Sequence, residues 1–335
     1  MESIGSGDFE YEVCLNWEKL PSGYDWTDAA AVAVDSNDSV YVFNRGNYPV
    51  IVFDSEGNVQ DSWGEDVFVR AHGITMGPEN TLYLTDDGDH TVRQCTLDGT
   101  VLMTIGNPGK ASAYQSGLPF HRPTDVAVDP KTGELYISDG YGNSSVHKYS
   151  PDGRLLFSWG SAGTDPGQFN IVHNIATDKD GWVYVADREN HRVQIFDSKG
   201  RYETQWVNMH RPCAIYISEE QKVYVGELGS GMPVNRDLGN IGPRISVYDT
   251  NGNLLSRLGN GFGEGYGQFM APHSICLDSK GDIYLGEVAW TNQNNWGDPA
   301  DGVRSFQKLV KSRICLLYTS PSPRDGLLAR MPSSA

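Results

Sequence analysis

The chain has 335 residues, a formal net charge of −17 at pH 7 and five cysteines. The negative charge opposes binding to a phosphate backbone or an anionic membrane surface, and no stretch approaches the roughly 20 apolar residues of a membrane span, so we expect neither nucleic acid nor membrane as a partner. The cysteines are scattered and without CxxC spacing, which argues against a disulfide framework.

The N-terminus, MESIGSGDFEYEV, lacks the basic and apolar regions of a signal peptide. As written, the sequence therefore predicts a soluble, cytoplasmic protein. A longer native N-terminus that carried an export signal would make the protein secreted or periplasmic instead.

A strand with an apolar-Tyr-apolar centre recurs along the chain. Its six copies are centred on Tyr41, Tyr83, Tyr136, Tyr184, Tyr224 and Tyr284. A second strand, most often ending in Asp-x-x-Gly, follows each copy in residues 49–57, 91–99, 145–153, 192–200, 244–252 and 305–311. An outer strand follows that turn in residues 58–64, 100–106, 154–160, 201–206 and 253–259. Short alternating strands repeated at roughly 40 to 60 residues predict an all-β fold, a six-bladed β-propeller without helical periodicity.

The two ends of the repeat array are incomplete. No outer strand follows Lys311, whereas residues 11–20 have the pattern of a strand but belong to no unit. We predict that this N-terminal strand completes the sixth blade and closes the ring, because closure removes an open sheet edge. The propeller domain would then span residues 1–312. Residues 313–335 show neither the repeat nor a period of their own, and are interpreted as a tail outside the propeller, disordered or of cloning origin.

Two connections, residues 229–243 and 290–302, are longer than a hairpin needs. Long loops on one face of a propeller form either a lid over a site or a plain extension, and the sequence leaves both open.

Histidines occupy one position in alternate copies of the repeat. His72, His173 and His273 each lie eleven residues before their tyrosine. Alternate blades of a six-bladed ring are about 120° apart, so equivalent positions converge on the axis. Taken singly, each histidine could be an ordinary hydrogen-bonded residue. Together they predict a zinc site, with three protein ligands and an open fourth position.

The other copies show that the blade itself does not require histidine at this position. The corresponding residues are Ala30, Thr124 or Asp125, and Cys213.

Three further residues are candidates for substrate chemistry. Arg45 and Arg188 each follow their tyrosine by four residues, which places both at the loop face, where a guanidinium can bind a carboxylate or pair with a neighbouring acid. Tyr141 lies between two glycines after the third tyrosine strand. It is interpreted as a packing residue or, beside a divalent cation, as a general base.

The acidic runs TDDGDH (85–90) and ADRENH (186–191) match no calcium-loop spacing and are interpreted as solvated turns. His90, His147 and His191 lack the shared offset and are not predicted as metal ligands.

The motifs that surround these candidates resemble a known family. They are AHGI (71–74), VHNI (172–175), APHSI (271–275), FNRG (43–46), SDGYGN (138–143) and ADRENHR (186–192). In combination they resemble the peptidyl-α-hydroxyglycine α-amidating lyases, six-bladed propellers with NHL-like repeats that complete peptide C-terminal amidation. The resemblance spans residues 11–311.

The resemblance implies roles for the candidate residues. His72, His173 and His273 would hold catalytic zinc, Tyr141 would be the general base, and Arg45 and Arg188 would position the substrate carboxylate. The family also carries a structural calcium bound by two backbone carbonyls and an aspartate. The carbonyl positions fall on Val32 and Ile74, whereas the aspartate position is Ser274, so the implied calcium set is incomplete.

Other family features are also replaced. The methionine two residues before the third histidine is Ala271, and the cysteine expected after Tyr141 is Gly142, which removes a disulfide of the secreted animal enzymes. From the sequence as written we expect no monooxygenase domain before the propeller, so the hydroxylated substrate would come from another protein.

By the resemblance, the chain would be a monomeric carbon–nitrogen lyase that cleaves an N-acyl or peptidyl α-hydroxyglycine to an amide and glyoxylate. Three alternatives stay open. A small carbinolamide such as ureidoglycolate could be the substrate, the chain could be a calcium-dependent lactonase, or it could be a non-catalytic NHL-type interaction module. Three histidines favour zinc over calcium, which prefers oxygen ligands.

Overall fold

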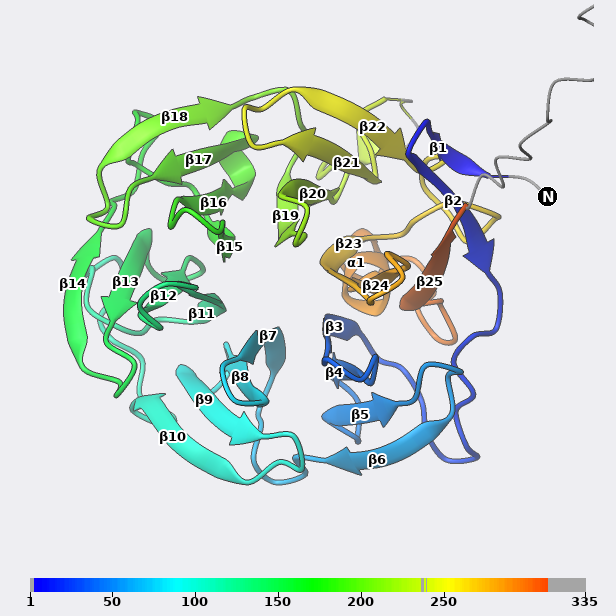
Figure 1. The fold of residues 1–335 in the computed structure, drawn as a ribbon, viewed down its shortest axis with the longest axis horizontal. Helices are drawn as coiled ribbons and strands as arrows, with labels where there is room; N and C mark the ends of the chain where they lie inside the picture. The colour runs from blue at the N-terminus through cyan, green and yellow to red at the C-terminus, as the bar shows by residue number, and fades with distance from the viewer. Residues whose placement is uncertain (1–2, 236–237, 239, 313–335) are drawn as a thin grey trace, which may run out of the picture.

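The computed structural model describes residues 3–235, 238 and 240–312. Six antiparallel sheets are arranged radially around a central axis, with the first strand of each blade innermost (Figure 1). The predicted six-bladed propeller is confirmed. The predicted tail, residues 313–335, lies outside the described residues.

The five complete blades each hold four consecutive strands, in the order inner to outer. Blade one has β3 (Ala29–Val34), β4 (Val40–Asn44), β5 (Val50–Phe53) and β6 (Val59–Trp63), and blade two has β7 (Ala71–Gly77), β8 (Thr81–Asp86), β9 (Thr91–Thr96) and β10 (Val101–Gly106). Blade three has β11 (Pro123–Val128), β12 (Leu135–Asp139), β13 (Ser145–Tyr149) and β14 (Leu155–Trp159), and blade four has β15 (Val172–Thr177), β16 (Val183–Asp187), β17 (Arg192–Phe196) and β18 (Tyr202–Trp206). Blade five has β19 (Pro212–Ile217), β20 (Lys222–Glu227), β21 (Arg244–Asp249) and β22 (Leu254–Leu258).

The repeated tyrosine has a structural explanation. It lies in the second strand of its blade with its ring buried. In blade four its hydroxyl, on Tyr184, donates to the carboxylate of Asp178 at 3.1 Å, and Asp178 also accepts the backbone N–H of Trp182 at 2.9 Å. One aspartate thus closes the turn between the first two strands and satisfies a phenol that packing has buried. Blades one and six repeat the pair, with Tyr41 on Asp35 and Tyr284 on Asp278.

The sixth blade is completed by the N-terminus, as predicted. It consists of β23 (Pro272–Leu277), β24 (Ile283–Glu287) and β25 (Phe306–Lys311), followed by β2 (Phe9–Cys14), which pairs antiparallel with β25. The predicted bounds 11–20 were wrong, because the strand ends at Cys14 and Asn16 adopts a left-handed conformation with φ of 56°. A fifth strand that was not predicted, β1 (Ile4–Ser6), covers the outer edge of β2.

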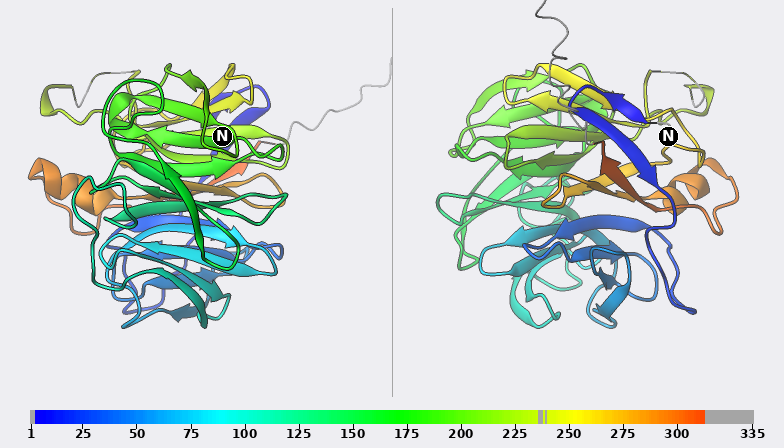
Figure 2. Two further views of the ribbon diagram at one scale, coloured as in Figure 1. Left: turned by 90° about the vertical axis from the view of Figure 1, so that its left-hand side faces the viewer. Right: turned by 45° about the vertical axis from the view of Figure 1, so that its right-hand side comes forward.

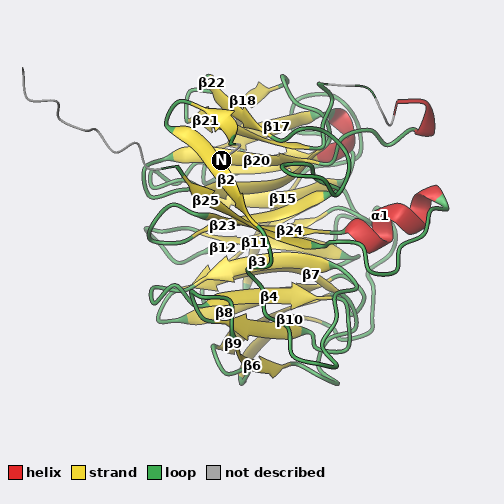
Figure 3. Cartoon of the chain, turned by 90° about the vertical axis from the view of Figure 1, so that its right-hand side faces the viewer, coloured by secondary structure: helices red, strands yellow, loops and turns green. Residues whose placement is uncertain are grey.

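One helix departs from the expected absence of helical structure. The helix α1 (Ala289–Trp296) lies in the long connection of blade six and is followed by Gly297, whose φ of 75° suits a glycine C-cap. Its sequence, AWTNQNNW, has no apolar stripe, which is why periodicity did not reveal it. The short 3-10 helix η2 (Pro233–Asn235) lies in the other long connection. Both project from the same face of the propeller (Figures 2 and 3).

Among the described residues, no helix is long and apolar enough to cross a membrane.

We expect Tyr11→Ala to destabilise the propeller by about 3 kcal/mol, because this β2 side chain is fully buried and its hydroxyl lies 3.3 Å from that of Tyr224 in the neighbouring blade. Urea unfolding measures the change. Leu15→Ala, just beyond β2 and 62% exposed, should change stability by no more than about 0.5 kcal/mol. Equal losses in the two variants would contradict the role given to β2.

Candidate functional site

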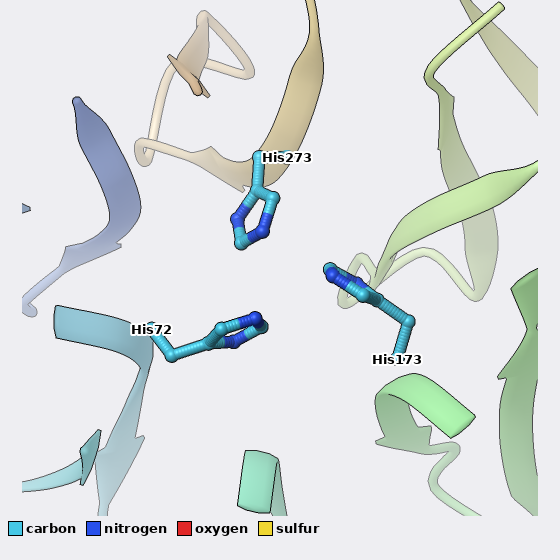
Figure 4. A group of neighbouring side chains, drawn as sticks. All are labelled: His72, His173 and His273. Carbon is cyan, nitrogen blue, oxygen red and sulfur yellow. The ribbon is translucent and has the colours of Figure 1, made fainter. Parts of the chain in front are cut away.

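Three histidines converge on the propeller axis, as their shared offset predicted. His72, His173 and His273 are the second residues of β7, β15 and β23, respectively, and their rings point toward one another (Figure 4). One ring nitrogen from each lies within 4.8 Å of the other two. The side chains are 2%, 1% and 4% exposed, respectively. The arrangement can hold one metal ion at the centre of the ring.

Backbone carbonyls of the intervening blades orient these rings. The contacts run from His72 Nδ1 to Thr124 O at 2.7 Å, from His173 Nδ1 to Cys213 O at 2.8 Å, and from His273 Nδ1 to Ala30 O at 2.6 Å. A carbonyl can only accept, so each Nδ1 carries the proton and each Nε2 keeps its lone pair. Ring nitrogens that donate to a carbonyl in this way are typical of metal-binding histidines. The blades without histidine thus contribute to the site through their backbone.

The environment also keeps the three rings neutral. Burial lowers the pKa of each histidine well below its ordinary 6.5. Positive charge adds to the effect, from Arg188 on His173 and from Arg45 on His273. Neutral imidazole is the form that binds metal, so protons do not compete for these ligands near neutral pH.

Tyr141 reaches the same point from the loop after β12. Its hydroxyl lies 3.2 Å from His72 Nε2 and 3.1 Å from His173 Nε2. The flanking glycines are required by space: a Cβ on Gly140 would come within 1.8 Å of a backbone oxygen, and one on Gly142 within 1.8 Å of a histidine ring. The two glycines therefore allow a tight loop that places the Tyr141 phenol beside the Nε2 atoms of His72 and His173.

Both predicted arginines lie beside the histidines, and both also make ion pairs. Arg188 Nη1 is 3.4 Å from the Tyr141 hydroxyl, and its Nε donates to Glu189 at 2.8 Å. Arg45 Nη1 pairs with Asp28 at 3.0 Å, and its Nε donates to the carbonyl of Ala71, next to His72, at 3.0 Å. Pairing with a neighbouring acid and a position suited to binding a substrate carboxylate, the two interpretations of these arginines, are therefore not exclusive.

The interpretation of the acidic runs as solvated turns was wrong for their aspartates. Asp86, Asp87 and Asp187 are fully buried. Asp86 accepts the backbone N–H of Arg70 at 3.0 Å, and Asp187 accepts that of Asn170 at 2.7 Å.

Asp86 and Asp187 each hold the chain just before it enters a histidine strand. Glu287 does the same before His273, accepting the N–H of Ala271 at 2.9 Å. Sequence reasoning missed this function, although its signal is present: an acid three residues after the repeated tyrosine in blades two to six.

The residues predicted for calcium lie in a different layer of the axis. Val32 and Ile74 line an axial cavity together with Asp125, Asn174 and Ser274. The Ser274 hydroxyl accepts the backbone N–H of Val32 at 3.1 Å. A carboxylate is present in this layer, but it comes from Asp125 of blade three and not from position 274. Calcium binding stays a prediction.

Asp125 is an uncompensated acid in the interior. It is bonded to the Asn174 amide and lies 3.4 Å from the Thr75 hydroxyl, both uncharged. Burial raises its pKa from 3.8 to about 7.

We expect Asp125→Asn to gain stability over the wild type as pH rises, by about 2 kcal/mol between pH 5.5 and 7.5 in chelator-treated protein. The folded wild type holds this proton up to about pH 7 while the unfolded chain releases it near 3.8, so rising pH disfavours the folded state. Urea unfolding at the two pH values measures the difference. Asp61→Asn, at an exposed position, should follow the wild type, and a pH-independent difference for Asp125→Asn would contradict the prediction.

The family model for the NHL repeat matches residues 120–149 and 169–196, within blades three and four. Human NHL repeat-containing protein 3 is 36% identical over 211 residues, which cover 59% of this chain and 60% of that protein. Peptidyl-alpha-hydroxyglycine alpha-amidating lyase 1 of Drosophila melanogaster is 31% identical over 253 residues, covering 69% of this chain and 45% of that protein. The chain therefore spans less than two thirds of either relative.

Solved structures agree with the architecture. A putative gluconolactonase superposes with a TM-score of 0.58 at 13% identity, covering 90% of this chain and 98% of that one, a likeness that concerns the fold alone. The repeats, the propeller and the sequence relatives agree: the chain is an NHL-repeat β-propeller homologous to the peptidyl-α-hydroxyglycine α-amidating lyases.

Proposed function

We propose that this protein is a zinc-dependent lyase that cleaves the carbon–nitrogen bond of an N-acyl or peptidyl α-hydroxyglycine to give an amide and glyoxylate. The observation that carries the proposal is the position of the Tyr141 hydroxyl. It lies 3.2 and 3.1 Å from the metal-binding nitrogens of two histidines and 3.4 Å from the guanidinium of Arg188. A proton acceptor, a metal site and an anion-binding group thus meet at one point.

The three histidines fit zinc. They offer three neutral nitrogen donors, the set that borderline cations such as zinc prefer, and they leave a fourth position for substrate. Each is oriented by a carbonyl on its other nitrogen. Bound zinc would supply Lewis acidity toward a substrate oxygen.

The chemistry asks little more of the protein. With Tyr141 as the phenolate, the hydroxyl proton of the carbinolamide passes to its oxygen, the carbon–oxygen double bond of glyoxylate forms, and the carbon–nitrogen bond breaks. The departing amide nitrogen takes up a proton, so the reaction is redox-neutral. Arg188, with Arg45 on the other flank of the histidines, holds the carboxylate and fixes the orientation of the reacting carbon.

The fly relative named as an amidating lyase supports the reaction class. A second candidate, a non-catalytic interaction module, is favoured by the higher identity to human NHL repeat-containing protein 3, whose name gives the repeat and no reaction. The two differ in their need for the histidines. An interaction function would survive their replacement, and the lyase would not.

We expect zinc-loaded protein to release glyoxylate from an N-acyl-α-hydroxyglycine, and chelator treatment to abolish the release. His72→Ala, His173→Ala and His273→Ala should each lose both bound metal, measured by elemental analysis, and glyoxylate release. His90→Ala, outside the axial site, is the matched control and should retain the bound metal. Metal-containing protein that releases no glyoxylate would refute the substrate assignment and direct attention to ureidoglycolate and lactones.

We expect Tyr141→Phe to retain bound zinc and to lower kcat by about 10²- to 10⁴-fold, because the change removes only the oxygen that, as phenolate, accepts the proton. Steady-state kinetics with metal analysis on the same sample measures both. Tyr114→Phe, on the preceding loop and 72% exposed, should behave as wild type. Unchanged kcat in Tyr141→Phe would rule out this residue as the base.

A further inference from the structure

The face that carries the histidines is richer in cations than the proposed substrate requires. Arg70, Arg122 and Arg211 each lie two residues before the position that histidine occupies in alternate blades. They therefore stand at the mouth of the axis, beside Arg45 and Arg188. This concentration is notable in a chain whose net charge is −17.

Two of these arginines share one carboxylate. Arg70 Nη1 lies 2.7 and 2.6 Å from the two oxygens of Asp87, and Arg122 Nε donates to the same aspartate at 3.0 Å. Asp87 is fully buried, whereas the arginine side chains are 33% and 39% exposed. Two guanidinium groups converge on a single negative charge, which leaves one positive charge in surplus with donors open to solvent.

A second pair has the same composition. Arg188 and Arg211 both bond to Glu189, each with one contact of 2.8 Å. Because Arg188 also reaches Tyr141, the surplus charge of this pair is matched by the carboxylate of the α-hydroxyglycine. Arg45 is neutralised by Asp28. The surplus of the Arg70–Arg122 pair has no counterpart in that substrate.

The Arg70–Arg122 pair is close to the reacting groups. The guanidinium carbon of Arg122 lies 4.5 Å from the ring centre of Tyr141, closer than that of Arg188 at 5.6 Å. An anion held by Arg122 would therefore belong to the same bound molecule as the group facing Tyr141. A mere tie between blades two and three would need only one arginine on Asp87.

We infer that the Arg70–Arg122 pair is a second anion-binding subsite, so that the preferred substrates carry a further carboxylate on the acyl side of the α-hydroxyglycine. An acidic acyl group or an acidic residue before the hydroxyglycine would meet this requirement. The inference rests on the proposed lyase function for the identity of the reacting group, but not for the existence of the subsite.

The test compares two substrates that differ only in a terminal group, N-glutaryl- and N-pentanoyl-α-hydroxyglycine. We expect kcat/KM of the wild type to favour the glutaryl compound by roughly 10- to 100-fold, the value of a charge-assisted contact. In Arg122→Gln and in Arg70→Gln this ratio should collapse toward one, mainly through loss on the glutaryl substrate. Arg201→Gln, an exposed arginine on the outside of blade four, should keep the wild-type ratio.

Equilibrium binding separates this inference from the reaction. Calorimetry with the unreactive N-glutarylglycine and N-pentanoylglycine should show the same preference, lost in Arg122→Gln and Arg70→Gln. If that preference is present and no glyoxylate is released from either substrate, the subsite stands and the lyase assignment fails.

No preference in the wild type, or a preference that both variants retain, would overturn the subsite. An equal fall in kcat/KM on the two substrates in the variants would overturn it as well, because the arginines would then bind the hydroxyglycine carboxylate itself. Each variant is first checked by thermal unfolding, and the two arginines give two independent tests.

Discussion

The site depends most on the hydrogen bonds between a buried acid at the end of a blade's second strand and the backbone that leads into its first strand. In blades two to six this carboxylate accepts backbone N–H groups from the segment that enters the inner strand. The next residues along the inner strand are those that reach the axis. Because each acid fixes the segment that leads into an inner strand, it also fixes the histidine that follows, and the rigid blades thereby hold the three-histidine cluster in place. In blade one the position is Asn44, whose amide instead donates to a carbonyl.

Alternate blades supply different groups at the axis. Three blades contribute histidine nitrogens, and the three between them contribute the carbonyls that fix the opposite ring nitrogens. Ala30, Thr124 and Cys213 differ in side chain, yet each presents its carbonyl to a histidine ring, and the Cys213 thiol also lies 3.3 Å from His173 Nδ1. Burial then keeps the imidazoles neutral, and the surrounding arginines add to the effect. The same hydrogen bonds thus hold the rings in place and leave each Nε2 lone pair free to bind a metal.

Most of the fold and the core of the site could be predicted because both follow from short-range periodicity. Six tyrosine strands imply six blades, and a common offset of eleven implies convergence, since equivalent positions in a closed ring face one axis. Features that do not recur in the repeat could not be predicted from the sequence. The helix α1 has no apolar stripe, and the end of β2 depends on one left-handed residue, Asn16. The acidic runs had the composition of surface turns, yet all four of their aspartates are buried.

The sequence by itself determined the number of blades, the closing strand and the three histidines, because these features recur or are conspicuously missing from a repeat. The tertiary structure alone decided which groups share a partner. That Arg70 and Arg122 meet on Asp87, that Arg188 and Arg211 meet on Glu189, and that Asp125 supplies the carboxylate of the second axial layer all depend on side chains from different blades. Such pairings follow from the angle and separation of packed sheets, which no pattern along one strand encodes.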